Sequence, residues 1–202
     1  MTGLRLIAGL GNPGSKYEQT RHNIGAVYVA ELAQRAGIRL VGDKAFKGRI
    51  GKGRFHGHDV LMLLPDTYMN LSGESVGAVQ RFYKLTAAEI LVAYDEVAFA
   101  PGEVRLKVGG GAGGHNGIRS VISSLGNDQG FVRLRIGVGH PGDKERMIGY
   151  LTSDRMPDAE RRVVEDALRF DDQVWRYLLD GDQQKAMTLL HAPTGSPDGK
   201  GD

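Results

Sequence analysis

The chain has 202 residues, of which 41% are hydrophobic and 25% charged, a composition typical of one globular domain with a single core. Cysteine is absent, which excludes disulfides and zinc sites built from thiolates. The N-terminal segment lacks the features of a signal peptide, and no apolar stretch approaches the roughly 18 residues needed to span a membrane. We therefore expect a cytoplasmic protein.

The charge is unevenly distributed along the chain. Residues 1–150 carry a net charge of +6, whereas residues 151–202 carry −4. A basic body with an acidic C-terminal segment suits a polyanionic partner. Chance clustering on a solvated surface remains the alternative when charge is considered alone.

Strand and helix patterns alternate along the chain. Short apolar or alternating runs predict strands at residues 4–10, 46–53, 55–64, 90–95, 104–108 and 131–138. Helical spacing of apolar residues predicts helices at residues 24–36, 72–84, 117–125, 144–151 and 157–179. The strands at 46–53 and 55–64 are expected to form a hairpin that turns at Gly53 and Arg54.

These patterns predict one α/β domain over residues 1–190, with a twisted mixed β-sheet flanked by helices. The final stretch, HAPTGSPDGKGD, lacks large apolar residues. It predicts a disordered tail at residues 191–202.

The stretch GLGNPGSKYEQTRHNIG, residues 9–25, contains the spacing G-x-G-x-x-G of a dinucleotide-binding loop. In such loops a helix begins inside the motif and presents free N–H groups to a pyrophosphate. Here Pro13 has no N–H to donate, and the apolar helical pattern begins only at Ile24. The acidic residue expected about 20 positions later would be Glu31, in the middle of a helix. These features argue against a dinucleotide-binding oxidoreductase.

Four of the five asparagines lie in glycine-rich or loop-like segments. An asparagine amide can hold carbonyl, amide and hydroxyl groups of a substrate without adding charge. Asparagine also favours turns, which explains any one of them alone. The group as a whole favours a binding site because histidine, tyrosine and methionine stand beside it. The residues concerned are Asn12, His22, Asn23, Tyr68, Met69, Asn70, His115 and Asn116.

Asp95 ends a predicted buried strand, which is the usual position of a functional residue in an α/β domain. A carboxylate there can hold a histidine in one tautomer and raise its basicity, although a turn cap is an equally good explanation. No G-x-S-x-G motif occurs, and cysteine is absent. A water activated by a base is therefore favoured over a covalent nucleophile.

Cations alternate on two predicted strands next to the segment VGGGAGGHNGIRS: Arg105, Lys107, Arg133 and Arg135. They could bind phosphates there, or protect the edge of a sheet. His56 and His58 alternate on another predicted strand, so both are expected on one face. No third ligand completes a set there, and we expect no functional metal.

Four segments together resemble the bacterial peptidyl-tRNA hydrolase family: GLGNPGSKYEQTRHNIG, LPDTYMNLSGESV, YDEVAFAPGEVRLKVGGGAGGHNGIRS and FVRLRIGVGHPG. The resemblance covers roughly residues 4–150. It implies one α/β domain that acts as a monomer without metal or cofactor. It also implies cleavage of the ester between a peptide and the 3′ ribose of tRNA. A non-catalytic RNA-binding relative of the same fold is the alternative.

The resemblance also implies roles for individual residues. His22 would be the general base and Asp95 its orienting partner. Asn12, Asn70 and Asn116 would position the water, the peptide and the tetrahedral intermediate. Tyr17, Tyr68, Met69 and His115 would line the substrate cleft. Lys107 and Arg135 would contact the phosphates of the tRNA. The family commonly has D-E-L-D where this chain has Asp95-Glu96-Val97-Ala98, so the packing of that loop is expected to differ.

Overall fold

A computed structural model describes residues 2–193 as one domain built on a seven-stranded mixed sheet, which confirms the predicted fold class. The strand order is β2-β3-β4-β1-β5-β7-β6. The four central strands β4, β1, β5 and β7 are parallel, and β2, β3 and β6 pair antiparallel at the two edges. The strands are β1 (Leu6–Gly9), β2 (Val41–Asp43), β3 (Gly48–Phe55), β4 (His58–Pro65), β5 (Ile90–Glu96), β6 (Val104–Val108) and β7 (Val132–Gly137).

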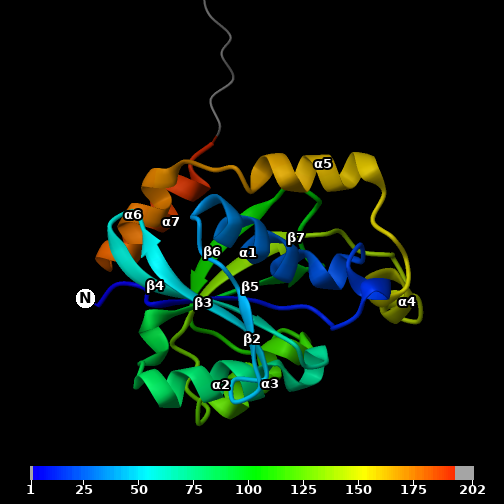
Figure 1. The fold of residues 1–202 in the computed structure, drawn as a ribbon. Coiled ribbons are helices and arrows are strands. Elements are labelled where there is room, and N and C mark those ends of the chain that lie inside the picture. Colours follow the sequence, from blue (N-terminus) through cyan, green and yellow to red (C-terminus); the bar gives the residue numbers. More distant parts are fainter. Residues whose placement is uncertain (1, 194–202) are drawn as a thin grey trace, which may run out of the picture.

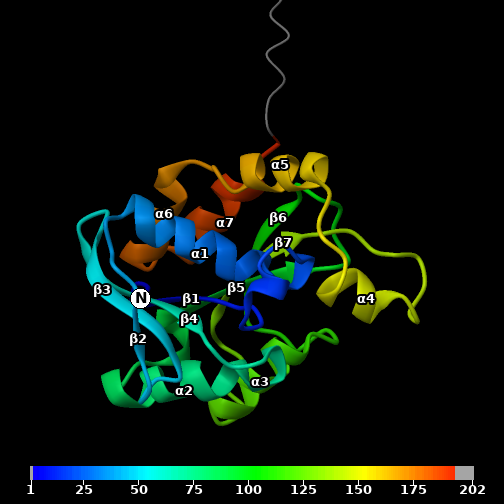
Figure 2. The same ribbon diagram turned by 45° about the vertical axis from the view of Figure 1, so that its right-hand side comes forward.

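Helices cover both faces of the sheet (Figures 1 and 2). One face carries α1 (Ile24–Arg35), α5 (Asp158–Ala167), α6 (Asp172–Asp180) and α7 (Gln183–His191). The other face carries α2 (Ser72–Tyr83) and α3 (Asn116–Ser124). The short helix α4 (Met147–Thr152) stands apart from both layers, at the right of both views.

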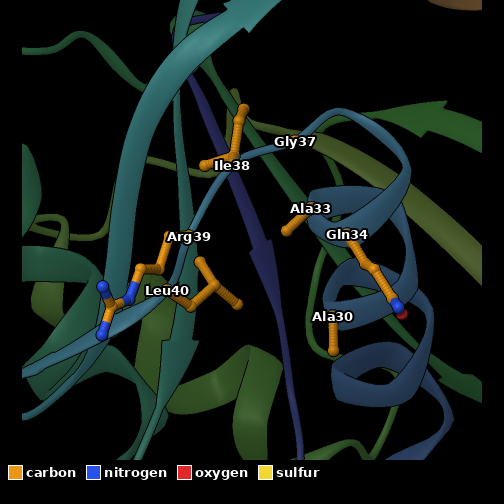
Figure 3. A pocket seen from close by; sticks show the side chains of 7 residues that line it. All are labelled: Ala30, Ala33, Gln34, Gly37, Ile38, Arg39 and Leu40. Atoms are coloured by element: carbon orange, nitrogen blue, oxygen red, sulfur yellow. The ribbon is translucent and has the colours of Figure 1, made fainter.

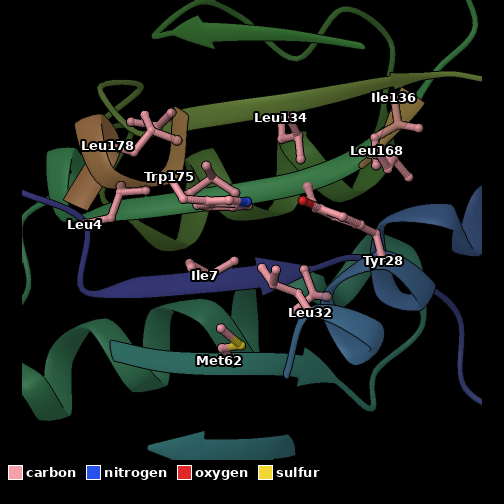
Figure 4. Close-up of a cluster of buried hydrophobic side chains, with 14 of the residues drawn as sticks. Leu4, Ile7, Tyr28, Leu32, Met62, Leu134, Ile136, Leu168, Trp175 and Leu178 are labelled. Atoms are coloured by element: carbon pink, nitrogen blue, oxygen red, sulfur yellow. The ribbon is translucent and has the colours of Figure 1, made fainter. Parts of the chain in front are cut away.

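The core consists of two clusters of buried side chains, one on each face of the sheet. Trp175 of α6 joins the C-terminal helices to α1, because its ring stacks near that of Tyr28, with 6.5 Å between the ring centroids (Figure 4). The side chain of His191 accepts a hydrogen bond from the backbone N–H of Leu106 at 3.0 Å, which ties α7 to the edge strand β6. The C-terminal helices are thus part of the same domain.

The predicted hairpin is present, but the prediction placed its turn at the wrong residues. The structure turns at His56 and Gly57, where both residues have positive φ, whereas Gly53 and Arg54 lie inside β3. His56 and His58 therefore do not share a strand. Each lies near a different carboxylate of α6: His56 Nε2 is 3.9 Å from Asp172, and His58 Nε2 is 2.9 Å from Asp180.

The C-terminal helices also differ from the prediction. The predicted helix at residues 157–179 is two helices, α5 and α6, because the chain turns at Leu168 and bends at Arg169. Asp171 then caps α6 by accepting a hydrogen bond from the N–H of Gln173. The helix α7 was not predicted and extends to His191, the first residue of the predicted tail. Residues 194–202 of that tail lie outside the described part of the chain. Within residues 2–193, no helix combines the length and apolar character needed to cross a membrane.

Candidate active site

A cleft of about 830 Å³ opens where the parallel strands end, the position at which α/β sheets bind ligands. Its walls come from the loop after β1, the turn before α1, the turn before α2, the end of β5, the glycine-rich loop before α3, and α4. Most of the residues that the sequence singled out line it: Asn12, His22, Tyr68, Met69, Asn70, Asp95, His115 and Asn116.

At the centre of the cleft, the carboxylate of Asp95 binds two histidines. His22 Nδ1 lies 2.8 Å from Oδ2, and His115 Nε2 lies 2.8 Å from Oδ1. The side chain of Asp95 is 1% exposed, and the two imidazole rings lie 5.0 Å apart between centroids. The sequence separates Asp95 from His22 by 73 residues, so only the fold brings them together.

The hydrogen bonds distinguish the two histidines. His115 Nδ1 accepts a hydrogen bond from the backbone N–H of Ile118 at 3.2 Å, so its proton resides on Nε2 and is donated to Asp95. Both of its nitrogens are thereby occupied. His22 donates from Nδ1 to Asp95, and its Nε2 has no protein partner among the described residues. Neutral His22 therefore presents a lone pair to the cleft, and of the two histidines bound to Asp95 it is the one that can accept a proton there.

Asp95 is ionised in this arrangement. Burial alone would raise the pKa of its carboxyl, but the electrostatic attraction and hydrogen bonds of the His115 and His22 imidazoles outweigh that effect and hold the pKa well below its usual range. A buried, ionised carboxylate favours a positive charge on the imidazole it contacts. Protonation of His22 during a reaction is stabilised in this way.

Asn12 is fixed by hydrogen bonds at both its backbone and its side chain. The amide of Asn23 accepts from Asn12 N and donates to Asn12 O, both at 2.9 Å. The side-chain Oδ1 of Asn12 accepts from the N–H of Met69 at 2.7 Å. With its oxygen occupied, Asn12 offers its Nδ2 donors to the cleft beside His22.

The other predicted binding residues differ in how they are placed. Met69 is buried, whereas Tyr68, Asn70 and Asn116 are exposed at the cleft. The Oδ1 of Asn116 accepts from Arg119 at 2.8 Å, which leaves its Nδ2 to face a ligand. Tyr17 does not line the cleft: its carbonyl accepts from Thr20 N and Oγ1, and so shapes the turn that leads to His22.

The cations of β6 and β7 form two cross-strand pairs, Arg105 opposite Arg135 and Lys107 opposite Arg133. Arg133 is buried, and its guanidinium binds the carbonyls of the glycine-rich loop. Arg135 binds Glu96 at 2.8 Å and lies over the ring of Phe99. Lys107 is exposed and makes no ion pair within residues 2–193. Neither Lys107 nor Arg135 lines the cleft itself, although Glu96, the partner of Arg135, does.

Sequence reasoning missed three contributors to the site. Asn23 was noted as a loop asparagine, but its inward orientation toward Asn12 could not be seen. Glu96 stands next to Asp95, yet its pairing with Arg135 depends on the neighbouring strand β7. The apolar wall formed by α4 carries no motif. Its only signal was an apolar helical pattern in a segment without an assigned role: Met147, Ile148 and Leu151.

His22, Asp95 and His115 are close enough to hold a metal ion, because their ligand atoms lie within 4.8 Å of one another. The hydrogen bond from Ile118 opposes this, since a metal on Nε2 of His115 would force the ring proton onto Nδ1, against another N–H. The residues fit a hydrogen-bonded triad better than a metal site.

A second hollow, of about 370 Å³, lies between α1 and the segment that follows it (Figure 3). Its only polar side chains are Gln34 and Arg39, and neither an imidazole nor a carboxylate lines it. This hollow therefore lacks the acid–base groups that the cleft around Asp95 contains. The hollow is lined by Ala30, Ala33, Gln34, Gly37, Ile38, Arg39 and Leu40.

Comparison with known proteins gives consistent results. Residues 6–197 match the model of the family described as peptidyl-tRNA hydrolase. The chain is 47% identical over 192 residues to a peptidyl-tRNA hydrolase of Shewanella loihica, covering 95% of this chain and 98% of the relative. A peptidyl-tRNA hydrolase of Azotobacter vinelandii is 48% identical with the same coverage. A crystal structure of peptidyl-tRNA hydrolase from Acinetobacter baumannii matches with a TM-score of 0.90 at 45% identity, covering 95% of this chain and 96% of that one. The chain therefore belongs to the peptidyl-tRNA hydrolase family.

Proposed function

We propose that the cleft hydrolyses the ester bond between peptide and tRNA in peptidyl-tRNA, releasing free tRNA and peptide, with a water activated by His22. Membership of the family supports this reaction. The observation that supports the roles of individual residues is the contrast within the triad. Asp95 binds both histidines, but His22 alone keeps a nitrogen open to the cleft.

The positions of these groups support the following steps. His22 Nε2 removes a proton from water as the water oxygen attacks the ester carbonyl carbon, and Asp95 stabilises the imidazolium that forms. Negative charge develops on the carbonyl oxygen, where the side-chain N–H groups of Asn12 and Asn116 stabilise it. The intermediate then collapses, the bond to the ribose oxygen breaks, and the imidazolium returns its proton to that oxygen.

The remaining residues bind the two ends of the substrate. Tyr68, Met69 and Asn70 form the side of the cleft that contacts the peptide, together with His115. Lys107 and Arg135 contact tRNA phosphate at the neighbouring sheet edge. Tyr17 supports the turn of His22 rather than the substrate. We further propose that the enzyme acts as a monomer in the cytoplasm, as expected from the sequence.

The test is hydrolysis of a model peptidyl-tRNA by the wild type and by His22→Ala, with a chelator present. Loss of the general base should slow hydrolysis by about 10²–10⁴-fold, while tRNA binding stays close to that of the wild type. A wild type that binds tRNA without cleaving it would favour the alternative of an RNA-binding relative. Full activity of His22→Ala would contradict the role of His22.

A further inference from the structure

The residue before the base, Arg21, is an arginine whose side chain is only 5% exposed. Its guanidinium reaches the C-terminal part of the chain. It donates to Glu160 Oε2 of α5 at 2.9 Å and to the carbonyl of Tyr150 in α4 at 3.4 Å. The guanidinium carbon also lies 3.8 Å from the centre of the Tyr150 ring. A buried cation is costly unless its partners are well placed, so these contacts constrain the segments that supply them.

The helix α4 needs such contacts because it has little packing of its own. It is six residues long and contains no buried residue, and Leu151 is its one residue that packs against the hydrophobic core. A helix of that length is unstable in isolation, so its position depends on tertiary contacts. Tyr150 supplies them: its ring lies against Arg21, and its hydroxyl donates to the carbonyl of Val138 at 2.6 Å.

Another side of α4 forms a wall of the cleft. Met147, Ile148 and Leu151 line it, and Ile148 is 77% exposed. Large apolar side chains exposed on a cleft can bind a ligand by burying apolar surface. The peptide of the substrate is the part with such surface, because the tRNA end is polyanionic.

Two backbone contacts join the same segments. The N–H of Met156 donates to the carbonyl of Gln19 at 3.0 Å, and Thr20 pairs with Arg155 in an isolated β-bridge. The turn that carries His22 is therefore also fastened, just before Arg21, to residues 155 and 156, which follow α4. Movement of α4 relative to the base is restrained by one cluster of contacts.

We propose that Arg21 is a positioning residue that holds α4 beside the base, and that it thereby sets the affinity for apolar peptides. Arg21 acts through Tyr150 and Glu160 and touches neither the substrate nor the reacting atoms. Its removal releases α4 and weakens binding of the peptide more than it slows the chemical step.

The experiment measures KM and kcat for two substrates, one tRNA ester of a single N-acetylated glycine and one of a peptide of several leucines. Arg21→Met should raise KM for the leucine peptide by about tenfold, equivalent to losing the contact of one buried apolar side chain. KM for the glycine ester and kcat for both substrates should change much less. Arg161→Met is the matched control, because Arg161 of α5 pairs with Asp158 and Glu165, away from the cleft.

A double-mutant cycle with Ile148→Ala separates positioning from general destabilisation. If Arg21 acts through α4, the effects of Arg21→Met and Ile148→Ala on KM for the leucine peptide are strongly non-additive. Additive effects, or equal changes for both substrates, would overturn the role of Arg21. If Arg21→Met does not fold, Glu160→Gln removes the ion pair while keeping the size of the side chain. Additive effects with Ile148→Ala, or equal changes of KM for both substrates, would then overturn the role of Arg21.

Because this role rests on the hydrolase function proposed above, wild type and His22→Ala are assayed on the same two substrates. A wild type inactive on both would refute the proposed function. An active wild type together with an Arg21→Met variant that does not discriminate between the substrates would refute only the role of Arg21.

Discussion

Two glycine-rich loops contribute to the cleft, and Gly9 and Gly11 of the first serve a different physical need from Gly113 and Gly114 of the second, although Gly14 of the first loop also has positive φ and open space around it. At the start of the first loop, a Cβ on Gly9, the last residue of β1, would lie 2.3 Å from the carbonyl oxygen of Gly25, and one on Gly11 would lie 2.9 Å from Ala26. These glycines allow close packing against α1. In the second loop, Gly113 and Gly114 have φ of +58° and +84°, and an added Cβ would meet nothing within 4 Å. These glycines allow a left-handed backbone.

Each loop leads to a His–Asn pair, but the roles of histidine and asparagine are reversed between the two pairs. In the first pair, His22 faces the cleft with a free nitrogen while Asn23 is buried against Asn12. In the second, His115 uses both nitrogens within the protein while Asn116 is exposed at the cleft. In the first dipeptide, the histidine is thus the base and the asparagine supports it. In the second, the histidine is the support and the asparagine is placed to contact the substrate.

The glycines give the largest expected difference between the loops. Gly9→Ala should lower the free energy of unfolding by about 4 kcal/mol or more, because the clash involves backbone that cannot move aside. Gly113→Ala should cost only about 1 kcal/mol, the strain of a left-handed alanine in open space. Urea unfolding of both variants measures this. Similar costs at the two positions would contradict the distinction.

The next largest effect concerns Asp95, which joins the two loops. Asp95→Asn should cost about 3 kcal/mol at pH 7, because a member of a buried hydrogen-bonded charge cluster is neutralised. The lowered pKa of Asp95 also fixes a pH dependence: the folded protein binds this proton at lower pH than the unfolded chain does. Its stabilisation is therefore complete above the unfolded pKa, near 4, and is lost as the pH falls from there toward the folded pKa.

Urea unfolding between pH 3 and pH 7 tests this account. The wild type should lose stability on acidification below about pH 4, and Asp95→Asn should lack that part of the loss. Identical pH profiles for the two proteins would show that Asp95 is not held ionised by the histidines.

The asparagines give a smaller contrast. Asn23→Ala should cost about 2 kcal/mol of stability, because the backbone N–H and C=O of Asn12 lose their partners. Asn116→Ala should change stability by less than about 0.5 kcal/mol, since the side chain is exposed, yet it should slow hydrolysis. Thermal unfolding and rate assays on the two variants check both halves. A strongly destabilised Asn116→Ala would place the second asparagine in a structural role.

Much of the sheet could be predicted because its strands are short apolar or alternating runs. The strand at 104–108 was placed at the observed bounds of β6, and the others were close to theirs. The strand β2 was missed because VGD has three residues and no buried side chain. The hairpin turn was misplaced because glycine is common in turns, which made Gly53 a candidate. In the structure Gly53 lies in β3 and packs closely against Ile38, whose side chain lies 2.6 Å from where a Cβ on Gly53 would be.

The sequence identified most of the residues of the site but not the contacts between them. Spacing could not show that Asp95 binds both His22 and His115, since that depends on β5 ending beside two loops distant in sequence. The side-chain direction of Asn23 and the long reach of Arg21 are tertiary properties that no local pattern records. The hydrogen bond from Ile118 to His115, which separates the base from its neighbour, is likewise visible only in the fold.

The most direct test of the central claim is chemical rescue of the two histidine variants by added imidazole. His22→Ala removes the nitrogen that accepts the proton, so free imidazole in the vacated space should accelerate hydrolysis by about tenfold or more. His115→Ala removes a support whose nitrogens face Asp95 and Ile118, so imidazole should not accelerate it. Rescue of His115→Ala together with none of His22→Ala would contradict the assignment of His22 as the base.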